Sequence, residues 1–139
     1  MGVYHDTITI STTHEGEIVD ITDDVQHVVS KSHVRDGLVC IFVPGSTAAV
    51  TTIEYEPGLL KDFPRALERL APKNIAYDHH ETWHDDNGRS HVRASILGPS
   101  LTVPIQEGLV IHGTWQQLVF IELDTQPRKR NLVVQIIGE

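Results

Sequence analysis

The segment TWQQLVFIELD, residues 114 to 124, decides the class of fold that the sequence predicts. Successive side chains of a strand point to opposite faces, which puts Val119 and Ile121 on one face and Leu118 and Phe120 on the other. Both faces are apolar in the middle, so this strand needs a cover on each side. A second sheet of the same chain or another subunit would provide that cover.

The segments on either side of this strand also favour β-structure. Residues 3–10 and 17–21 alternate polar and apolar side chains, while residues 38–44 are almost continuously apolar and predict a strand that is buried on both faces. That strand is expected to lie beside the strand at 49–55. From residue 92 onward the whole pattern is β-like. Gly and Pro divide it into VRASILG, LTVPI, LVIHG, TWQQLVFIELD and RNLVVQIIG. About nine strands result.

Two helices are predicted in the first half of the chain. One begins at Thr22 and runs to Arg35, with Gly37 as its left-handed cap. The other has apolar residues at helical spacing from residue 60 to residue 70, and its proline at position 64 favours a start near Asp62. The fold class is therefore α+β and predominantly β: a β-sandwich with about two helices packed against it, in a single domain of residues 1–139.

Composition excludes several partners. The 139 residues include 19 acidic and 11 basic side chains and carry a net charge of -8, which argues against binding to nucleic acid or an anionic membrane. No apolar run approaches the roughly 18 residues of a membrane span, and the N-terminus has no signal-peptide pattern, so a cytoplasmic location is expected. Cys40 is the only cysteine and is expected to be a small buried hydrophobe.

The stretch YDHHETWHDDNGRSH, residues 77 to 91, has the greatest density of reactive side chains. It holds four of the nine histidines together with four carboxylates. Imidazoles and carboxylates are ligands for transition metals and can exchange protons near neutral pH. The spacing matches no compact signature such as H-E-x-x-H, so a metal site here would depend on the fold to bring distant ligands together.

Five segments together resemble the YjbQ-like proteins, a family labelled secondary thiamine-phosphate synthase. They are PGSTAAVTTIE, the Ser90-His91 pair, SILGPSLTVPI, GTWQ and PRKR, and the resemblance covers nearly the whole chain. It implies a compact homotrimer with a cleft between subunits that takes a metal or a small anion. None of these three properties follows from composition or spacing.

The resemblance also assigns metal-binding and catalytic residues. His79 and His91 match family positions whose histidines bind a divalent metal such as zinc. Many members have a histidine where this chain has Gly45. Either His84 or His80 replaces that ligand, or the site binds a metal weakly or only across a subunit boundary. His91 and the retained glutamate, Glu54, are the predicted catalytic residues.

A phosphate or similar anion is expected beside the metal. Its predicted contacts are hydroxyl groups, amides and one guanidinium, which can grip phosphate through two parallel bonds; they are Ser46, Thr47, Ser95, Thr114, Gln116 and Arg128. These residues predict a metal-assisted enzyme that acts on a small phosphorylated metabolite, with weak thiamine-phosphate synthase activity. The alternative is a non-enzymatic trimeric module that binds a small anion or metabolite. Trp115 is expected in a core or an interface.

Overall fold

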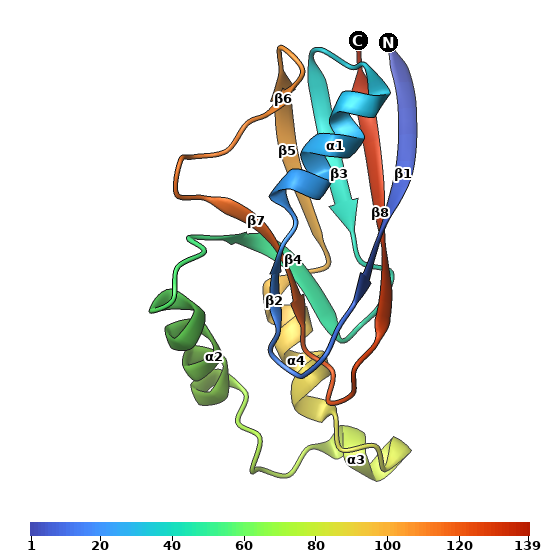
Figure 1. Cartoon of the computed structure of the whole chain (residues 1–139). Coiled ribbons are helices and arrows are strands. Elements are labelled where there is room, and N and C mark those ends of the chain that lie inside the picture. The colour runs from blue at the N-terminus through green and yellow to red at the C-terminus, as the bar shows by residue number, and fades with distance from the viewer.

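Two antiparallel sheets form the body of the molecule (Figure 1), and the computed structural model describes the whole chain, residues 1–139. The larger sheet has the strand order β1-β8-β3-β5-β6. Its strands are β1 (Gly2–Ser11), β8 (Lys129–Gly138), β3 (Gly37–Phe42), β5 (Ser100–Gln106) and β6 (Leu109–Val110). The smaller sheet has the order β2-β7-β4 and contains β2 (Ile18–Asp20), β7 (Gln117–Glu122) and β4 (Ala48–Ile53).

Four helices accompany the sheets. They are α1 (Thr22–Ser32), α2 (Leu59–Leu70), α3 (Asp78–Trp83) and α4 (Gly88–Leu97). The predicted class, an α+β fold that is mostly β with helices against a sandwich, is confirmed. The predicted element count is not, because the chain has four helices instead of two and eight strands instead of nine.

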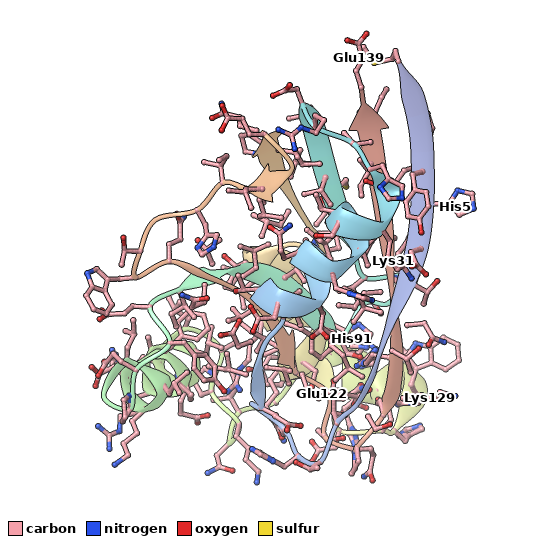
Figure 2. The ribbon with its side chains drawn as sticks, turned by 45° about the horizontal axis from the view of Figure 1, so that its top comes forward. His5, Lys31, His91, Glu122, Lys129 and Glu139 are labelled. Carbon is pink, nitrogen blue, oxygen red and sulfur yellow. The ribbon has the colours of Figure 1, made fainter.

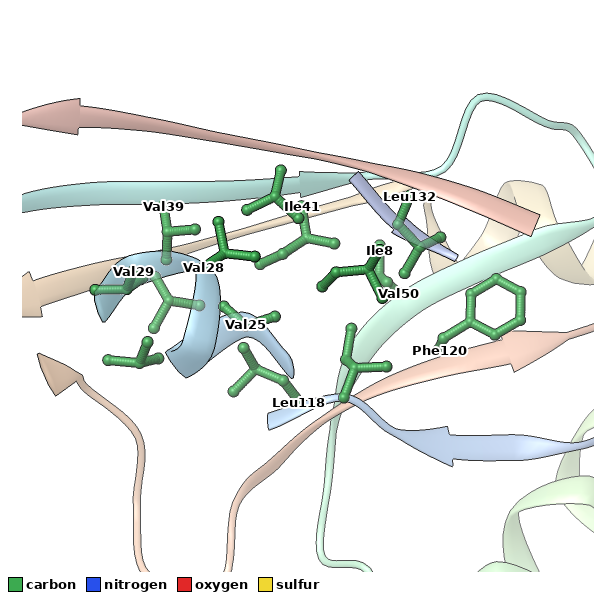
Figure 3. Packing of buried hydrophobic residues seen from close by; sticks show 14 of the residues in the cluster. Ile8, Val25, Val28, Val29, Val39, Ile41, Val50, Leu118, Phe120 and Leu132 are labelled. Carbon is green, nitrogen blue, oxygen red and sulfur yellow. The ribbon is translucent and has the colours of Figure 1, made fainter. Parts of the chain in front are cut away.

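The main core lies between the larger sheet on one side and α1 with β7 on the other (Figure 3). This core includes Val25 of α1, Ile41 of β3 and Phe120 of β7, each 0% exposed. A second core forms on the opposite face of β7, where Val119 and Ile121 join residues of α2 and α4. Strand β7 is therefore covered on both faces by its own chain, by a sheet on one side and by helices on the other.

The outer face of the larger sheet has no cover. Leu38 and Phe42 of β3 are 47% and 41% exposed there, so the predicted burial of residues 38–44 on both faces is wrong for one of them. Cys40 lies between these residues and is half-buried instead of buried. A shallow hollow of about 490 Å³ on this face is lined mainly by apolar side chains of β1, β3 and β8.

The sequence predicted a strand at residues 92–98, and this prediction is wrong: these residues belong mostly to helix α4. The residues that this helix buries are Gly88, Arg89, Ser90, Arg93 and Ala94, while Val92 and Ile96 are exposed. Ala94 has the only apolar side chain among the buried ones, so the apolar positions alone gave a false strand period.

The helix limits also differ from the prediction. Helix α1 ends at Ser32, and its left-handed cap is His33, with φ of 60°, instead of Gly37. Gly37 opens β3, where a Cβ atom would lie only 2.1 Å from the carbonyl oxygen of Ile137 on β8. Helix α2 begins at Leu59, which leaves Pro64 inside the helix instead of in its first turn.

One predicted strand pairing and one predicted strand boundary are also wrong. Strands β3 and β4 were expected to be neighbours, but they belong to different sheets, because β3 pairs with β5 and β8 whereas β4 pairs with β7. Strand β7 begins at Gln117, three residues later than expected. The preceding turn leaves Trp115 74% exposed, outside the core of the chain.

Candidate functional site

The histidine-rich stretch folds into α3 and the first turn of α4, at the end of the molecule where β7 leads into β8 (Figure 1). His91 lies in the same half of the molecule as Glu122 and Lys129 (Figure 2). The rings of His79 and His91 are stacked at a tilt of 37°, with their centroids 4.3 Å apart. The fold thus brings together the two histidines that were predicted as metal ligands.

A carboxylate lies beside the first of these rings. Nδ1 of His79 lies 3.4 Å from Oδ1 of Asp85. A histidine that gives its Nδ1 proton to a carboxylate keeps a lone pair on Nε2, which is the arrangement of many metal-binding histidines. Asp85 therefore fits the role of a residue that positions His79 for a ligand.

Burial lowers the pKa of His91 below its ordinary value of 6.5, and the neighbouring His79 ring lowers it further. The negative charges of Asp124 and Asp85 oppose this shift without reversing it. His91 is thus neutral near pH 7, the state in which an imidazole accepts a proton or binds a metal.

Asp124 is the centre of the polar contacts behind the histidines. It was not among the predicted site residues. Its carboxylate is 2% exposed and accepts hydrogen bonds from the backbone N–H of Thr125 at 2.7 Å, the Thr47 hydroxyl at 3.1 Å and Nε of Arg128 at 3.0 Å. Burial by itself raises the pKa of Asp124, but these donors, the Asn87 amide and the Arg128 charge together hold that pKa below its ordinary value. Asp124 is therefore a charged, fixed group.

One polar side chain near the histidines lacks a partner: the Ser90 hydroxyl is fully buried and has no hydrogen bond. The Asn87 amide lies between two carboxylates. Its nitrogen donates to Asp124 at 3.4 Å in one orientation, or to Asp85 at 2.9 Å in the other, which has the better distance and satisfies both amide atoms.

These donors fit a divalent metal in part. Two adjacent imidazoles and a carboxylate behind one of them are the ligand types that zinc takes. No three histidine, cysteine, aspartate or glutamate side chains converge as a metal-binding group within the chain. His79 and His91 would hold the ion, and its remaining positions would need water, substrate or another copy of the protein.

A buried ion pair supports the turn beside Asp124. Arg130 donates from Nε and Nη2 to the two carboxylate oxygens of Glu122, which is 0% exposed, and from Nη2 to the Thr47 hydroxyl at 2.9 Å. Thr12 adds a hydroxyl bond of 2.8 Å to Glu122. The sequence contains one signal for this site, since Glu122 and Asp124 interrupt an otherwise apolar strand.

The same arginine occupies the space beside Gly45. A Cβ atom at Gly45 would lie 3.0 Å from Nη1 of Arg130. A larger side chain at this position would require the guanidinium to shift.

Two of the predicted anion contacts share a hollow. Ser46 and Ser95 both line a depression of about 280 Å³ between the turn after β3 and helix α4. The Ser95 hydroxyl donates to the His91 carbonyl at 2.8 Å, and the Thr47 hydroxyl donates to Asp124. Ser46 is thus the most available of these hydroxyl groups, while Thr47 supports the buried carboxylate.

Arg128 lies half-exposed at the edge of this cluster. It contacts only Oδ2 of Asp124, through Nε at 3.0 Å and Nη2 at 2.9 Å. The guanidinium has five N–H donors, so several remain open to solvent or to an anion. Asp124 therefore fixes the orientation of the Arg128 guanidinium, and the remaining N–H groups are free to bind an anion.

The structure does not bring the other predicted anion-binding residues to this end. Gln116 bonds Thr52 and Gly113 at the opposite end of the β4–β7 ladder, where Thr114 and Glu54 are also found. The ladder from Gln117 to Glu122 spans roughly 16 Å at about 3.3 Å per residue. Within one chain these residues are separate from the histidine pair.

His84 and His80 form a second pair on α3. Their rings meet edge to face with centroids 5.6 Å apart, and Nδ1 of His80 accepts the backbone N–H of Asp86. His84 is exposed and caps the helix in a left-handed conformation, with φ of 57°. Neither the His80 ring nor the His84 ring joins the stacked pair of His79 and His91. Within one chain, therefore, neither of them supplies the predicted third metal ligand.

The fold and this cluster define a class: a small β-sandwich that presents paired histidines over a buried carboxylate–arginine network. The chain belongs to the family described as UPF0047 protein YjbQ-like, whose model matches residues 6–139. A UPF0047 protein of Archaeoglobus fulgidus is 38% identical over 130 residues, which cover 94% of this chain and 98% of the relative. One from Methanothermobacter thermautotrophicus is 38% identical over 139 residues, which cover 100% and 95%.

Solved structures agree with this assignment. A protein of unknown function from Sulfolobus solfataricus has a TM-score of 0.94 at 38% identity and covers 99% of each chain. A hypothetical protein from Aeropyrum pernix has a TM-score of 0.91 at 30% identity, with 98% of this chain and 99% of that chain covered. No helix of the present structure is long and apolar enough to cross a membrane.

Proposed function

We propose that this protein is a metal-assisted enzyme that acts on a small phosphorylated metabolite, with weak thiamine-phosphate synthase activity. The observation that carries the proposal is the stacking of His79 and His91, with ring centroids 4.3 Å apart, against a network that ends in the half-exposed Arg128. Metal ligands and a phosphate-gripping guanidinium are the two components that phosphoryl or diphosphate chemistry requires.

Each residue would have a distinct role. Arg128, held in one orientation by Asp124, would bind the phosphate through its free N–H groups, and Ser46 would add a hydroxyl donor. His79 and His91 would hold the divalent ion, which supplies positive charge to a departing phosphate or diphosphate. Where His91 is not a ligand, its neutral ring is suited to accept a proton from the attacking group.

The thiamine-phosphate reaction places a specific demand on this site. Diphosphate leaves from a carbocation-like centre when the pyrimidine and thiazole halves are joined, so negative charge must be stabilised as it departs. Arg128 is the open cation of the cluster, because Arg130 is bound to Glu122 and Thr47. One arginine and one metal ion would give weak stabilisation, which agrees with a secondary activity.

Paired histidine variants test the proposal. His91→Ala should abolish uptake of zinc and any turnover with a panel of phosphorylated metabolites. The matched control is His84→Ala, because its ring is exposed and outside the stacked pair. Metal content is measured by elemental analysis after dialysis against zinc. Equal zinc content and turnover in the wild-type protein and His91→Ala would refute the assignment.

A non-enzymatic small-anion or metabolite binder is the second candidate. The observation that favours it is that no third histidine, cysteine or carboxylate joins His79 and His91 as a metal-binding group within the chain. In that case Arg128→Gln would weaken binding of inorganic phosphate, while His91→Ala would leave it unchanged. Phosphate binding without metal uptake or turnover in the wild-type protein would favour this candidate over the enzyme.

We also propose that the protein assembles with copies of itself, as a homotrimer, through the open face of the larger sheet. The outward residues of β1, β3, β5 and β8 include only one full charge, Lys129. A chain of net charge -8 repels its own copies, and an uncharged contact face keeps that repulsion lowest. Leu38, Phe42 and Val133, exposed by 40–47%, would gain burial there.

The area of this face limits such a contact. Four strands about 4.8 Å apart and up to ten residues long cover on the order of 600 Å², which a copy in a ring of three divides between two neighbours. Each contact therefore needs flanking side chains as well to reach the roughly 800 Å² per partner of a standard interface. A ring of three requires different parts of the surface to meet, which would pair the β1–β8 half of one copy with the β3–β5 half of the next. Such a ring would also allow Glu54, Thr114 and Gln116 to approach a neighbouring histidine pair.

Light scattering tests the assembly directly. Val133→Glu places a charge in the middle of the face and should give a monomer, whereas Thr9→Glu, on β1 toward the edge of the face, should weaken assembly less. A wild-type monomer at working concentration would refute the trimer. A trimer that persists in Val133→Glu would place the contact on another surface.

A further inference from the structure

A further hollow, of about 270 Å³, lies at the end of the β4–β7 ladder that is remote from the histidine pair. Its walls come from β5, from the turn that holds His112 and Gln116, and from Thr52 of β4. The apolar part is formed by four side chains: Leu101, Val103, Ile111 and Leu118. No aspartate, glutamate, lysine or arginine lines it.

The contacts of His112 fix its tautomer. Its Nδ1 lies 2.7 Å from the Gln116 carbonyl oxygen and 3.0 Å from that of Gly113. Carbonyl oxygens only accept hydrogen bonds, so Nδ1 must carry the proton. In this tautomer the lone pair lies on Nε2, and no protein group donates to that atom.

The opposite side of the hollow offers hydrogen-bond donors. Gln116 is fixed by the Gly113 N–H at 3.0 Å and donates to the Thr52 hydroxyl at 3.2 Å, which leaves the Thr52 proton available. The backbone of Thr102 on β5 also lies at the edge of the larger sheet here, because β6 pairs only with Ile105 and Gln106 and the Pro104 carbonyl already accepts the N–H of Ile111. A free edge presents alternating backbone N–H and C=O groups.

From this geometry we infer that the hollow binds a small uncharged ring that carries adjacent N–H and C=O groups, a cyclic amide of the pyrimidinone type. The ring N–H donates to Nε2 of His112, and the ring carbonyl accepts from a threonine hydroxyl or the β5 edge. The apolar side chains contact the ring faces. A charged ligand is disfavoured because it would lose hydration without meeting an opposite charge.

This site does not depend on the proposed function at the histidine pair. His112 was assigned no role from the sequence, and its ring is not part of the stacked cluster. Gln116, predicted as an anion contact, acts here as a neutral positioning residue whose amide is already bonded on both sides. The ligand class therefore differs from the phosphate expected at Arg128.

Uracil is the probe, and 1,3-dimethyluracil is its matched control, since methylation removes both N–H donors but keeps the ring and carbonyls. Protein NMR titration of the full chain should show uracil binding with a dissociation constant of about 1 mM or tighter. The resonance shifts should be centred on Thr52, Thr102 and His112. The dimethyl compound should bind at least about fivefold more weakly, as loss of one hydrogen bond predicts.

Two variants separate this site from the other one. His112→Phe keeps an aromatic ring but removes the acceptor, and should weaken uracil binding by about five- to tenfold. His91→Ala should leave uracil binding unchanged even if it abolishes metal uptake. Equal binding of uracil and its dimethyl analogue, equal binding by His112→Phe and the wild-type protein, or shifts located elsewhere would each overturn the inference.

Discussion

Replacing Arg130 with methionine should be among the most destabilising single changes in this protein. Glu122 is 0% exposed, and Arg130, whose side chain is 11% exposed, binds both of its carboxylate oxygens. Arg130→Met keeps most of the side-chain volume but leaves a buried, uncompensated carboxylate. The loss in free energy of unfolding is expected to be about 3–5 kcal/mol, a large part of the 5–15 kcal/mol of a typical domain.

Arg128→Met is the matched control. Arg128 is 50% exposed and contacts only Asp124, which keeps the donors Thr125 and Thr47 when the arginine is lost. A half-exposed pair of this kind contributes about 1 kcal/mol or less. The two arginine variants should therefore differ by at least about 2 kcal/mol in urea unfolding at one protein concentration.

A second substitution tests the cause of the loss. Adding Glu122→Gln to Arg130→Met replaces the buried charge with a neutral amide and should recover at least about 1 kcal/mol. Thr12 can still donate to the amide oxygen at that position. Equal losses in Arg130→Met and Arg128→Met, or no recovery in the double variant, would refute the argument from an unpaired buried charge.

Three further outcomes are expected. Gly37→Ala should cost about 1–3 kcal/mol or more, because its Cβ would lie 2.1 Å from the Ile137 carbonyl oxygen, whereas Gly2→Ala, with nothing within 4 Å, should be neutral in thermal unfolding. The pKa of His91 is lower in the folded chain than its ordinary value of 6.5. Its contribution to stability is therefore complete above about pH 6.5 and is lost as the pH falls, because the unfolded chain binds the proton more readily. With a chelator present, the wild-type urea midpoint should fall more between pH 7.5 and pH 5 than that of His91→Gln; equal falls would contradict this. The lowered pKa of Asp124 predicts stability that is lost below about pH 3.8, so Asp124→Asn should show a smaller loss than the wild-type protein between pH 5 and pH 3.

Periodicity predicted the strands best where burial follows the strand period. β1 and β8 alternate exposed and buried residues and matched their predicted spans closely. It failed at α4, where Ser90 and Arg93 are buried and polar side chains therefore occupy the inner positions of the helix. Hydrophobic patterns cannot reveal a polar inner face that is stabilised by hydrogen bonds from other elements, such as those that link Arg93 to Ala71 and Glu68.

The candidate site was predictable only in part for the same reason. His79 and His91 were selected through family resemblance, and the fold places them in contact. Asp124 and Arg130 were missed, because their importance comes from partners that are distant in sequence. Thr47 and Asp124, for example, are 77 residues apart, and no local pattern encodes that hydrogen bond.

The sequence by itself determined the class of fold, the double burial of residues 118–121 and the family, since strand period, apolar content and local motifs are properties of neighbouring residues. Only the tertiary structure decided that helices of the same chain cover one face of β7 and that the larger sheet is bare on its outer side. It also decided that Gln116 and His91 lie at opposite ends of one ladder. Those outcomes depend on how distant segments pack, and the free energy of such packing belongs to the whole chain instead of to any one segment.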